Sequence, residues 1–125
     1  MRLKLSKHKY GAKQTTLDGI TFDSKMEAEY YRQLKLLQQG KVITDLELQP
    51  TFELLESTTL PNGKKIRGIK YKADFQYREN GRPVVVDVKG ARTAEFKIKE
   101  KLFYHRYPDL QLKLVTKKNG RWLEL

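Results

Sequence analysis

Residues 71–90 read YKADFQYRENGRPVVVDVKG, and this stretch decides the fold. The dipeptide Asn80-Gly81 separates two runs rich in β-branched and aromatic residues, which is typical of a β-hairpin. We therefore expect two strands, over roughly residues 69–77 and 82–89. The valines at 84–86 indicate a buried strand, yet Asp87 and Lys89 follow them directly. A core-like strand that ends in charged residues calls for a chemical explanation.

The alternation of side chains along a strand indicates which charged residues lie together. Asp87 and Lys89 are two residues apart and share one face of the second strand. On the first strand, the aromatic residues from Tyr71 to Tyr77 share one face and Asp74 has the other. If the apolar faces of the two strands align, Asp74 joins Asp87 and Lys89.

Two carboxylates on one face of a sheet repel each other, and their partial burial costs several kcal/mol unless they are neutralised. A divalent cation neutralises them well, since oxygen ligands suit Mg²⁺. The alternative is an ion pair from Asp87 to Lys89, or to Lys72 across the strands. We favour the metal site because Asp74 is spaced to lie on the matching face, and the ion pair remains the alternative.

The composition sets the broad class. The chain has 125 residues and no cysteine, which suits one compact domain without disulfides or thiolate metal sites. No apolar run is long enough to span a bilayer, and the N-terminus lacks the apolar region of a secretory signal. We expect a basic flexible arm over residues 1–13, a single domain over residues 14–125, and a cytoplasmic location without a membrane partner.

The charge points to a polyanionic partner. The formal net charge is +11 and the isoelectric point is near 9.8. A surplus of this size favours nucleic acid first and an acidic membrane second. A basic surface that only contacts solvent is the simpler alternative.

Two segments have the pattern of helices. The segment at 23–40, DSKMEAEYYRQLKLLQQG, has Ser24 as N-cap, Glu27 three residues later and Gly40 at its end. The segment at 91–109, ARTAEFKIKEKLFYHRYPD, has Thr93 as N-cap and ends before Pro108. The segment at 58–68, TTLPNGKKIRG, is expected to be a turn-rich basic loop. The element order predicts a mixed sheet flanked by helices, of the α/β or α+β class, with the second helix crossing over between parallel strands.

Four further residues are candidates for the site or its surroundings. Glu27 falls within the apolar arc of the first helix, so it can point toward the sheet as well as complete the capping box. Residues 41–56 are expected to form a strand that Pro50 interrupts at an edge or bend. Gln49 precedes Pro50, where it either contacts the site or ends the strand, and we favour the structural role. Lys97 and Lys101 are one turn apart on the second helix, where contact with phosphates and exposure to solvent are equally plausible.

These residues, taken in order, resemble the PD-(D/E)XK nuclease superfamily. Glu27 lies on a first helix, Asp74 on one strand, and Asp87-Val88-Lys89 on the next. Ala73 stands where that superfamily often has proline. The segments GITFDSKMEAEYY, LELQP, YKADFQY and VVVDVKG are also similar to an uncharacterised group of small phage and prophage proteins assigned to the superfamily. The resemblance covers residues 22–116.

The resemblance implies a fold, a cofactor and a role for each residue. The fold would be a restriction-endonuclease-like αβββαβ core. Asp74 and Asp87 would bind Mg²⁺, for which Mn²⁺ can substitute, together with the backbone carbonyl of Val88. Glu27 would complete the ligand set directly or through water. Lys89 would position the attacking water and stabilise the charged transition state.

The resemblance also implies a function. The chain would be a Mg²⁺-dependent DNA endonuclease that hydrolyses phosphodiester bonds in phage DNA recombination, repair or processing, inside a bacterial host cell. We favour a structure-specific enzyme similar to Holliday-junction resolvases, acting as a homodimer because two strands need cutting. Contacts with the nucleic acid are expected from Lys72, Lys97, Lys101 and Gln49.

Two other functions remain open at this point. The chain can be a non-catalytic basic nucleic-acid-binding module on a nuclease fold, or a regulator that contacts protein partners through its basic arm. A pure phosphate binder gains nothing from Asp74 and Asp87, since acidic residues repel the nucleic-acid backbone. A regulator leaves both carboxylates unexplained. RNA is not excluded as the substrate.

Overall fold

The computed structural model of the chain describes residues 14–125. The chain divides into two compact units, of which the first ends at Ile43 and the second is Thr44–Leu125. The basic arm expected over residues 1–13 lies outside the described residues, and the single domain over residues 14–125 stays a prediction.

The described part of the first unit contains a short hairpin of β1 (Thr15–Leu17) and β2 (Ile20–Phe22). Asp18 and Gly19 join the strands with φ values of 55° and 75°. These left-handed values are those of the two-residue turns that fit the twist of a hairpin. Aspartate tolerates the left-handed region and glycine adopts it freely, so this dipeptide favours the turn.

The hairpin leads into helix α2 (Lys25–Gln39), which begins and ends where the sequence predicts. The Ser24 hydroxyl accepts a hydrogen bond from the Glu27 N–H at 3.1 Å, so the predicted N-cap is confirmed. Gly40 caps the C-terminal end, where its N–H donates to the Leu36 carbonyl at 3.0 Å. Leu34 lies on the apolar face of the helix and is buried.

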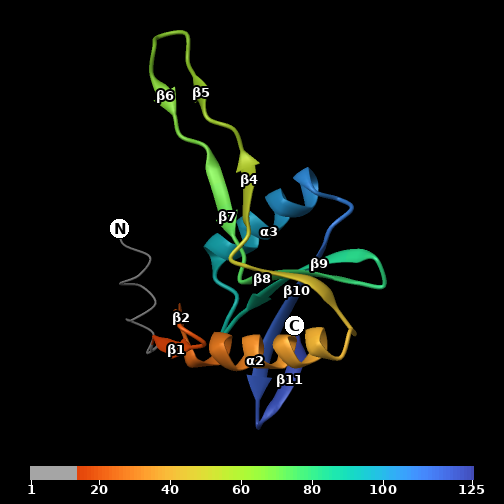
Figure 1. Ribbon diagram of the computed structural model, residues 1–125. Helices are drawn as coiled ribbons and strands as arrows, with labels where there is room; N and C mark the ends of the chain where they lie inside the picture. Colours follow the sequence, from red (N-terminus) through yellow and green to blue (C-terminus); the bar gives the residue numbers. More distant parts are fainter. Residues whose placement is uncertain (1–13) are drawn as a thin grey trace. The chain divides into compact units, whose positions relative to one another are not determined.

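The second unit is built on a five-stranded sheet with the order β11-β10-β9-β8-β3 (Figure 1). Strand β10 pairs with β9 in parallel and every other neighbouring pair is antiparallel, so the sheet is mixed. Helix α3 (Ala94–Arg106) connects β9 to β10, which confirms the predicted crossover between parallel strands. The strands are β3 (Thr44–Leu48), β8 (Phe75–Glu79), β9 (Arg82–Val88), β10 (Gln111–Lys118) and β11 (Arg121–Glu124).

Helix α3 packs on this sheet through its aromatic side chains. Thr93 caps its first turn by accepting the Phe96 N–H at 3.0 Å, as predicted. Phe96 and Phe103 are buried in a core cluster that also contains Val85 from β9 and Leu112 from β10. Residues 14–125 thus form a mixed α+β structure with two helices and a five-stranded mixed sheet. Neither of these helices is long and apolar enough to cross a membrane.

Two strands of this sheet continue beyond it after a bend. Strands β3 and β8 pair within the sheet, and the same two chain segments then pair again as β4 (Thr51–Leu55) and β7 (Ile69–Lys72). At the bend, the Gln49 N–H donates to the Asp74 carbonyl at 2.9 Å and the Ala73 N–H donates to the Pro50 carbonyl at 3.0 Å. The interruption predicted at Pro50 is therefore confirmed as a bend.

The prediction of one uninterrupted strand over residues 69–77 is wrong, because this segment contains β7 and the start of β8 with a break between them. Phe75 pairs with Val86, whereas Ala73 belongs to the core cluster around Val85, so Ala73 and Phe75 face opposite sides of the sheet. Side chains two residues apart on a regular strand share one face, which means that the alternation is broken at Asp74. Apolar residues at every second position from 71 to 77 conceal this break in the sequence.

Beyond the bend, the paired segments form a narrow projection that we call the ribbon, residues 51–72 (Figure 1). It contains β4 and β7 near the sheet, and β5 (Thr58–Thr59) paired with β6 (Lys65–Ile66) farther out. The turn-rich loop expected at 58–68 is therefore a two-stranded extension. Strands exposed on both faces bury no apolar side, so their sequence lacks the alternation that predicts a strand.

Candidate functional site

Asp74 lies at the bend where the ribbon leaves the sheet. Its Oδ2 accepts a hydrogen bond from the Val88 N–H at 2.7 Å, and its own N–H donates to the Val86 carbonyl at 3.1 Å. Strand β8 begins one residue later, so the side chain of Asp74 takes a strand N–H that a backbone carbonyl would otherwise accept. The carboxylate is thereby held against Val88, the central residue of Asp87-Val88-Lys89.

Asp87 is buried near the end of β9, with 4% of its surface exposed. Its Oδ2 accepts a hydrogen bond from the Tyr71 hydroxyl and lies 3.2 Å from Lys89 Nζ. Burial, followed by the negative charge of Asp87, raises the pKa of Tyr71 far above its usual value. The Tyr71 hydroxyl therefore stays protonated and acts as the donor in this bond.

Lys89 is fixed at both ends. Its N–H donates to the Val115 carbonyl of β10 at 2.8 Å, which extends the parallel pairing past the last residue of β9. Its Nζ lies 4.0 Å from the centroid of the Phe96 ring in the first turn of α3. The ammonium thus sits between a carboxylate and an aromatic face, and both stabilise its positive charge. This role of Phe96 was not predicted from the sequence, where its position one turn after the N-cap was the only signal.

The two carboxylates and the Val88 backbone form a set of oxygen donors suited to Mg²⁺. The N–H and C=O of a strand residue point to the same side, so the Val88 carbonyl faces the side on which its N–H meets Asp74. Within residues 14–125 there is no group of three or more His, Cys, Asp or Glu side chains arranged to hold a metal. Mg²⁺ usually takes one or two carboxylates and keeps several waters, so the donors present are compatible with it.

The ion pair that the sequence left as the alternative is present in the structure. Lys89 and Asp87 form it within one strand, and Lys72 takes no part. A buried pair of this kind contributes little net stability, because the loss of hydration offsets the attraction. The pair also leaves unexplained why Asp74 is held on the N–H of Val88, the residue between Asp87 and Lys89. Pairing and metal binding are compatible, since a carboxylate offers about four lone-pair positions.

Glu27 belongs to the first compact unit and lies in the first turn of α2. It is 5% exposed, which agrees with its predicted place within the apolar arc of the helix. Its backbone N–H donates to the Ser24 hydroxyl, as the capping box requires. Its addition to the ligands Asp74 and Asp87 stays a prediction from the sequence.

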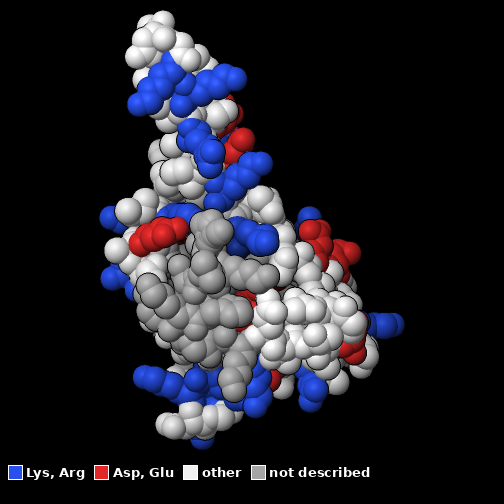
Figure 2. All heavy atoms as spheres, turned by 90° about the vertical axis from the view of Figure 1, so that its left-hand side faces the viewer, with Lys and Arg blue, Asp and Glu red and all other residues white. Residues whose placement is uncertain are grey.

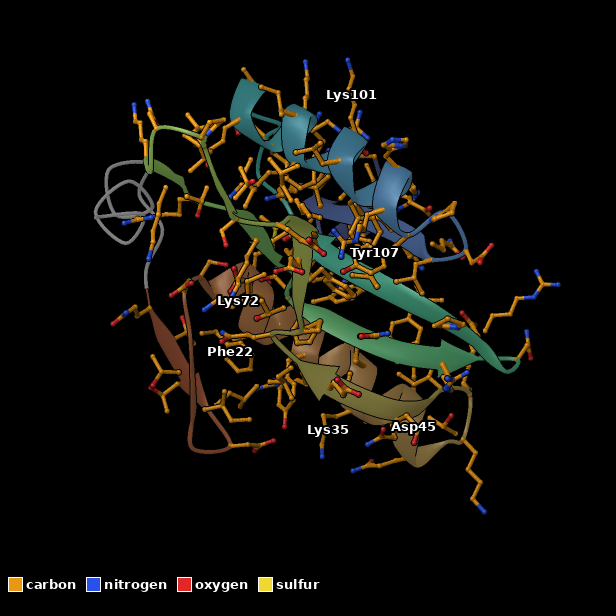
Figure 3. The ribbon with its side chains drawn as sticks, turned by 90° about the horizontal axis from the view of Figure 1, so that it is seen from above. Phe22, Lys35, Asp45, Lys72, Lys101 and Tyr107 are labelled. Carbon is orange, nitrogen blue, oxygen red and sulfur yellow. The ribbon has the colours of Figure 1, made fainter. Side chains whose placement is uncertain are left out.

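The predicted nucleic-acid contacts lie on different elements of the second unit. Gln49 has a φ of 53° at the bend, and its backbone N–H meets Asp74, so its placement agrees with the structural role. Lys72 is exposed on β7, two residues before Asp74. Lys97 and Lys101 are exposed on α3, and Lys101 projects from the side of the helix that faces away from the sheet (Figure 3). Contact of these side chains with nucleic acid stays a prediction.

Comparison with known proteins identifies a family without an assigned activity. The model of the family described as "Protein of unknown function (DUF1064)" matches residues 7–121. No protein with a curated description matches the chain. A solved structure described as "Crystal structure of SSO0001" matches with 20% sequence identity and a TM-score of 0.46, over 78% of this chain and 48% of that chain. The present chain thus spans about half the length of that protein, and a likeness at this level carries no argument about function.

Proposed function

The chain belongs to the DUF1064 family of proteins of unknown function, and we propose that it is a metal-dependent DNA endonuclease of the PD-(D/E)XK type. The observation that carries the proposal is the hydrogen bond from the Val88 N–H to Asp74 Oδ2. This bond holds the Asp74 carboxylate against Val88, the middle residue of the D-x-K element. The other two residues of that element are the buried Asp87 and Lys89. A mixed sheet with a helix between its parallel strands is consistent with a restriction-endonuclease-like core.

The metal site of this enzyme would consist of Asp74, Asp87 and the carbonyl of Val88. Glu27 is the candidate for one further ligand. A Mg²⁺ or Mn²⁺ ion bound there would lower the pKa of a coordinated water and stabilise charge on a phosphoryl oxygen. Tyr71 contributes by donating to Asp87 Oδ2, which restricts the orientation of that carboxylate.

Lys89 would act on the attacking water and on the reacting phosphate. Its ammonium is held between Asp87 and the ring of Phe96, so its position is set before any substrate arrives. A fixed cation stabilises the negative charge that develops in phosphodiester hydrolysis, and it can also orient a water for in-line attack. Its side chain is 23% exposed, which leaves it reachable from solvent.

The substrate of this enzyme would be DNA. The net charge of +11 favours a polyanion as the partner. The two carboxylates, Asp74 and Asp87, distinguish a hydrolase from a simple phosphate binder, which gains nothing from acidic residues. The favoured subtype is a structure-specific nuclease, similar to Holliday-junction resolvases and active as a homodimer in phage DNA recombination, repair or processing. This subtype rests on the resemblance described above.

A non-catalytic DNA-binding module is the second candidate function. One observation favours it, namely that Lys89 Nζ lies 3.2 Å from Asp87 Oδ2 and can neutralise that carboxylate by itself. In that case Asp74 would only cap the Val88 N–H at the bend.

A cleavage assay separates these two functions. Four-way junction, flap, duplex and single-stranded DNA would be incubated with Mg²⁺, Mn²⁺ or EDTA. The proteins would be the wild type, Asp74→Asn and Asp87→Asn, with Asp109→Asn as the control at an exposed aspartate in the same unit. We expect metal-dependent cutting by the wild type and the control, and a loss of about 100-fold or more in both site variants.

Two results would overturn the nuclease. One is cutting that survives in both site variants, which would assign the activity to other residues or to a contaminant. The other is no cutting of any substrate by the wild type together with tight, salt-sensitive binding, which would assign the binding module.

A further inference from the structure

The ribbon, residues 51–72, concentrates positive charge on an exposed element. Its two acidic residues are both paired with Arg106 at the end of α3, Glu53 at 3.5 Å and Glu56 at 3.6 Å. Figure 2 shows basic side chains along the ribbon. None of its five cations forms an ion pair with any residue between 14 and 125, and all five are exposed: Lys64, Lys65, Arg67, Lys70 and Lys72.

The outer end of the ribbon has a defined turn. The Leu60 N–H donates to the Lys64 carbonyl and the Gly63 N–H donates to the Leu60 carbonyl, both at 2.8 Å. The Asn62 side chain accepts the Lys64 N–H at 2.9 Å. Gly63 has a φ of 86°, a conformation that glycine adopts without strain. A preformed tip loses little conformational entropy when it binds a partner.

The inner end of the ribbon is anchored on α3. The Tyr107 hydroxyl donates to the Glu53 carbonyl at 2.8 Å, and Figure 3 shows Tyr107 beside this part of the chain. Phe52 packs edge-on against Phe103, with ring centroids 5.2 Å apart. The ribbon is therefore held on the same core that carries the candidate site.

Gly68 fixes the path of the ribbon between its two pairs of strands. A Cβ at this position would collide with the Leu55 carbonyl oxygen and would lie 2.9 Å from the Ser57 backbone nitrogen. Both are backbone atoms that cannot move aside as a side chain can. Glycine is therefore required for the two chain segments of the ribbon to approach each other this closely.

From these features we infer that the ribbon enters the major groove of duplex DNA and holds the substrate against the site at its base. The major groove of B-DNA, about 12 Å wide, admits a two-stranded β-ribbon, whereas the deep and narrow major groove of A-form RNA does not. The five cations would contact the phosphates that line the groove. Leu60 and Ile66, exposed by 38% and 36%, supply apolar contacts of the kind that thymine methyl groups accept.

The position of the ribbon agrees with this role. Lys72 ends β7, and Asp74 follows it by two residues, so groove contact and catalysis would share one continuous segment of chain. The inference rests on the proposed function in one respect, that the polyanion is DNA. Binding is measured without metal, so its test does not require that the protein cuts.

The test compares two variants that each lose one lysine and one arginine from exposed sites. Lys65→Ala/Arg67→Ala alters the ribbon, and Lys118→Ala/Arg121→Ala alters the turn between β10 and β11. Binding of duplex DNA would be measured in EDTA over a range of salt concentrations. We expect the slope of log K against log[salt] to fall by about 0.9 for each lost phosphate contact in the ribbon variant, about 1.8 in total, and to stay unchanged in the control. Equal slopes in the two variants would overturn the inference.

A chemical footprint tests the groove itself. Dimethyl sulfate modifies guanine N7, which lies in the major groove, so the wild type should protect guanines that the ribbon variant leaves reactive. Duplex RNA should bind without sensitivity to the ribbon variant. Wild-type binding without N7 protection, or a ribbon effect of equal size on duplex RNA, would contradict the assignment.

Gly68→Ala displaces the ribbon without removing any charge. We expect it to lose guanine protection while the five-stranded sheet stays folded, as measured by circular dichroism. Normal protection in a folded Gly68→Ala protein would overturn the inference. If ribbon-dependent binding is found but no metal supports cutting, the proposed nuclease fails and the inference stands.

Discussion

At the scale of single residues, the charge on Asp87 is balanced by two neighbours of different kinds. Lys89 supplies a positive charge at 3.2 Å, and Tyr71 supplies a hydroxyl donor that burial keeps protonated. A carboxylate with 4% exposure needs such partners, because an unpaired buried charge is strongly destabilising. The hydroxyl adds no charge, so its contribution can be measured separately from that of the ion pair.

Tyr71→Phe tests the contribution of this hydroxyl. We expect the free energy of unfolding to fall by about 1.5–3 kcal/mol, since the change removes a hydrogen bond to a buried charged group. The ring remains, so the core around Phe96 and Phe103 keeps its packing. Denaturant unfolding at neutral pH measures the difference.

Tyr104→Phe is the matched control for this substitution. The Tyr104 hydroxyl donates to the neutral Leu112 carbonyl at 3.0 Å, so its loss should cost only about 0.5–1.5 kcal/mol. If Tyr71→Phe costs no more than Tyr104→Phe, the hydroxyl of Tyr71 is not a special partner of Asp87.

At the scale of elements, the bend between sheet and ribbon places Asp74 where it is. Gln49 and Asp74 meet across the bend through a backbone hydrogen bond of 2.9 Å, and Gln49 adopts a left-handed φ of 53°. Such a conformation costs a residue other than glycine about 1–3 kcal/mol, which the surrounding pairing must offset. If the role of Gln49 is structural, the stability of the protein should depend on the backbone conformation at this position and not on the side-chain amide.

Two substitutions of Gln49 separate the bend from direct contact with DNA. Gln49→Gly should leave the free energy of unfolding unchanged or raise it by up to about 1 kcal/mol, with DNA binding retained. Gln49→Val should lower it by more than about 1 kcal/mol, because a β-branched residue is poorly suited to positive φ. Both changes remove the amide, so weaker DNA binding in a stable Gln49→Gly protein would instead assign a contact.

The sequence predicts the elements better than it predicts the bend. The caps at Ser24 and Thr93 and the turn at Asn80-Gly81 are local signals, and the structure confirms all three. The bend at Asp74 lies where the chain that pairs with β9 as β8 has no pairing with β9 as β7, although it stays paired with the segment of β3 and β4. No local signal in the sequence reports that loss of a partner. The alternation of Tyr71 to Tyr77 runs across the bend unchanged, although the faces switch there.

The sequence predicts only part of the candidate site, because the rest depends on the bend and on contacts between distant elements. Asp74, Asp87 and Lys89 follow from spacing on a hairpin, and the structure brings Asp74 to the Val88 N–H. Tyr71 was expected on the opposite face from Asp87, yet its hydroxyl binds that residue because the break at Asp74 turns it toward α3. Phe96 reaches Lys89 from another element, so hairpin spacing could not reveal it.

At the scale of the whole molecule, the net charge of +11 and the two carboxylates of Asp74 and Asp87 have opposite effects on a polyanionic partner. The cations draw a polyanion toward the protein, while the negative charges of Asp74 and Asp87 would repel a phosphate that approaches them. The proposed divalent ion at Asp74 and Asp87 would remove this conflict, since it would reverse the local charge where a phosphate must approach. The long-range attraction and the local site are then consistent with one another.

Metal-linked stability tests this balance without any cleavage. An ion that binds only the folded protein stabilises it by about 2.7 kcal/mol at a concentration 100 times Kd. We expect Mn²⁺ and Mg²⁺ to raise the Tm of the wild type and of Asp109→Asn by several degrees, and to leave that of Asp74→Asn unchanged. Asparagine keeps an oxygen to accept the Val88 N–H, so the variant loses a charge and not the bend.

The same measurement extends to the first unit. If Glu27 supplies a ligand, Glu27→Gln should require a higher metal concentration for the same rise in Tm, while its backbone N–H still caps on Ser24. If Asp74→Asn and the wild type respond equally to metal, the ion binds elsewhere. The carboxylates would then form part of a buried ion-pair network, and the positive charge of the chain would serve binding alone.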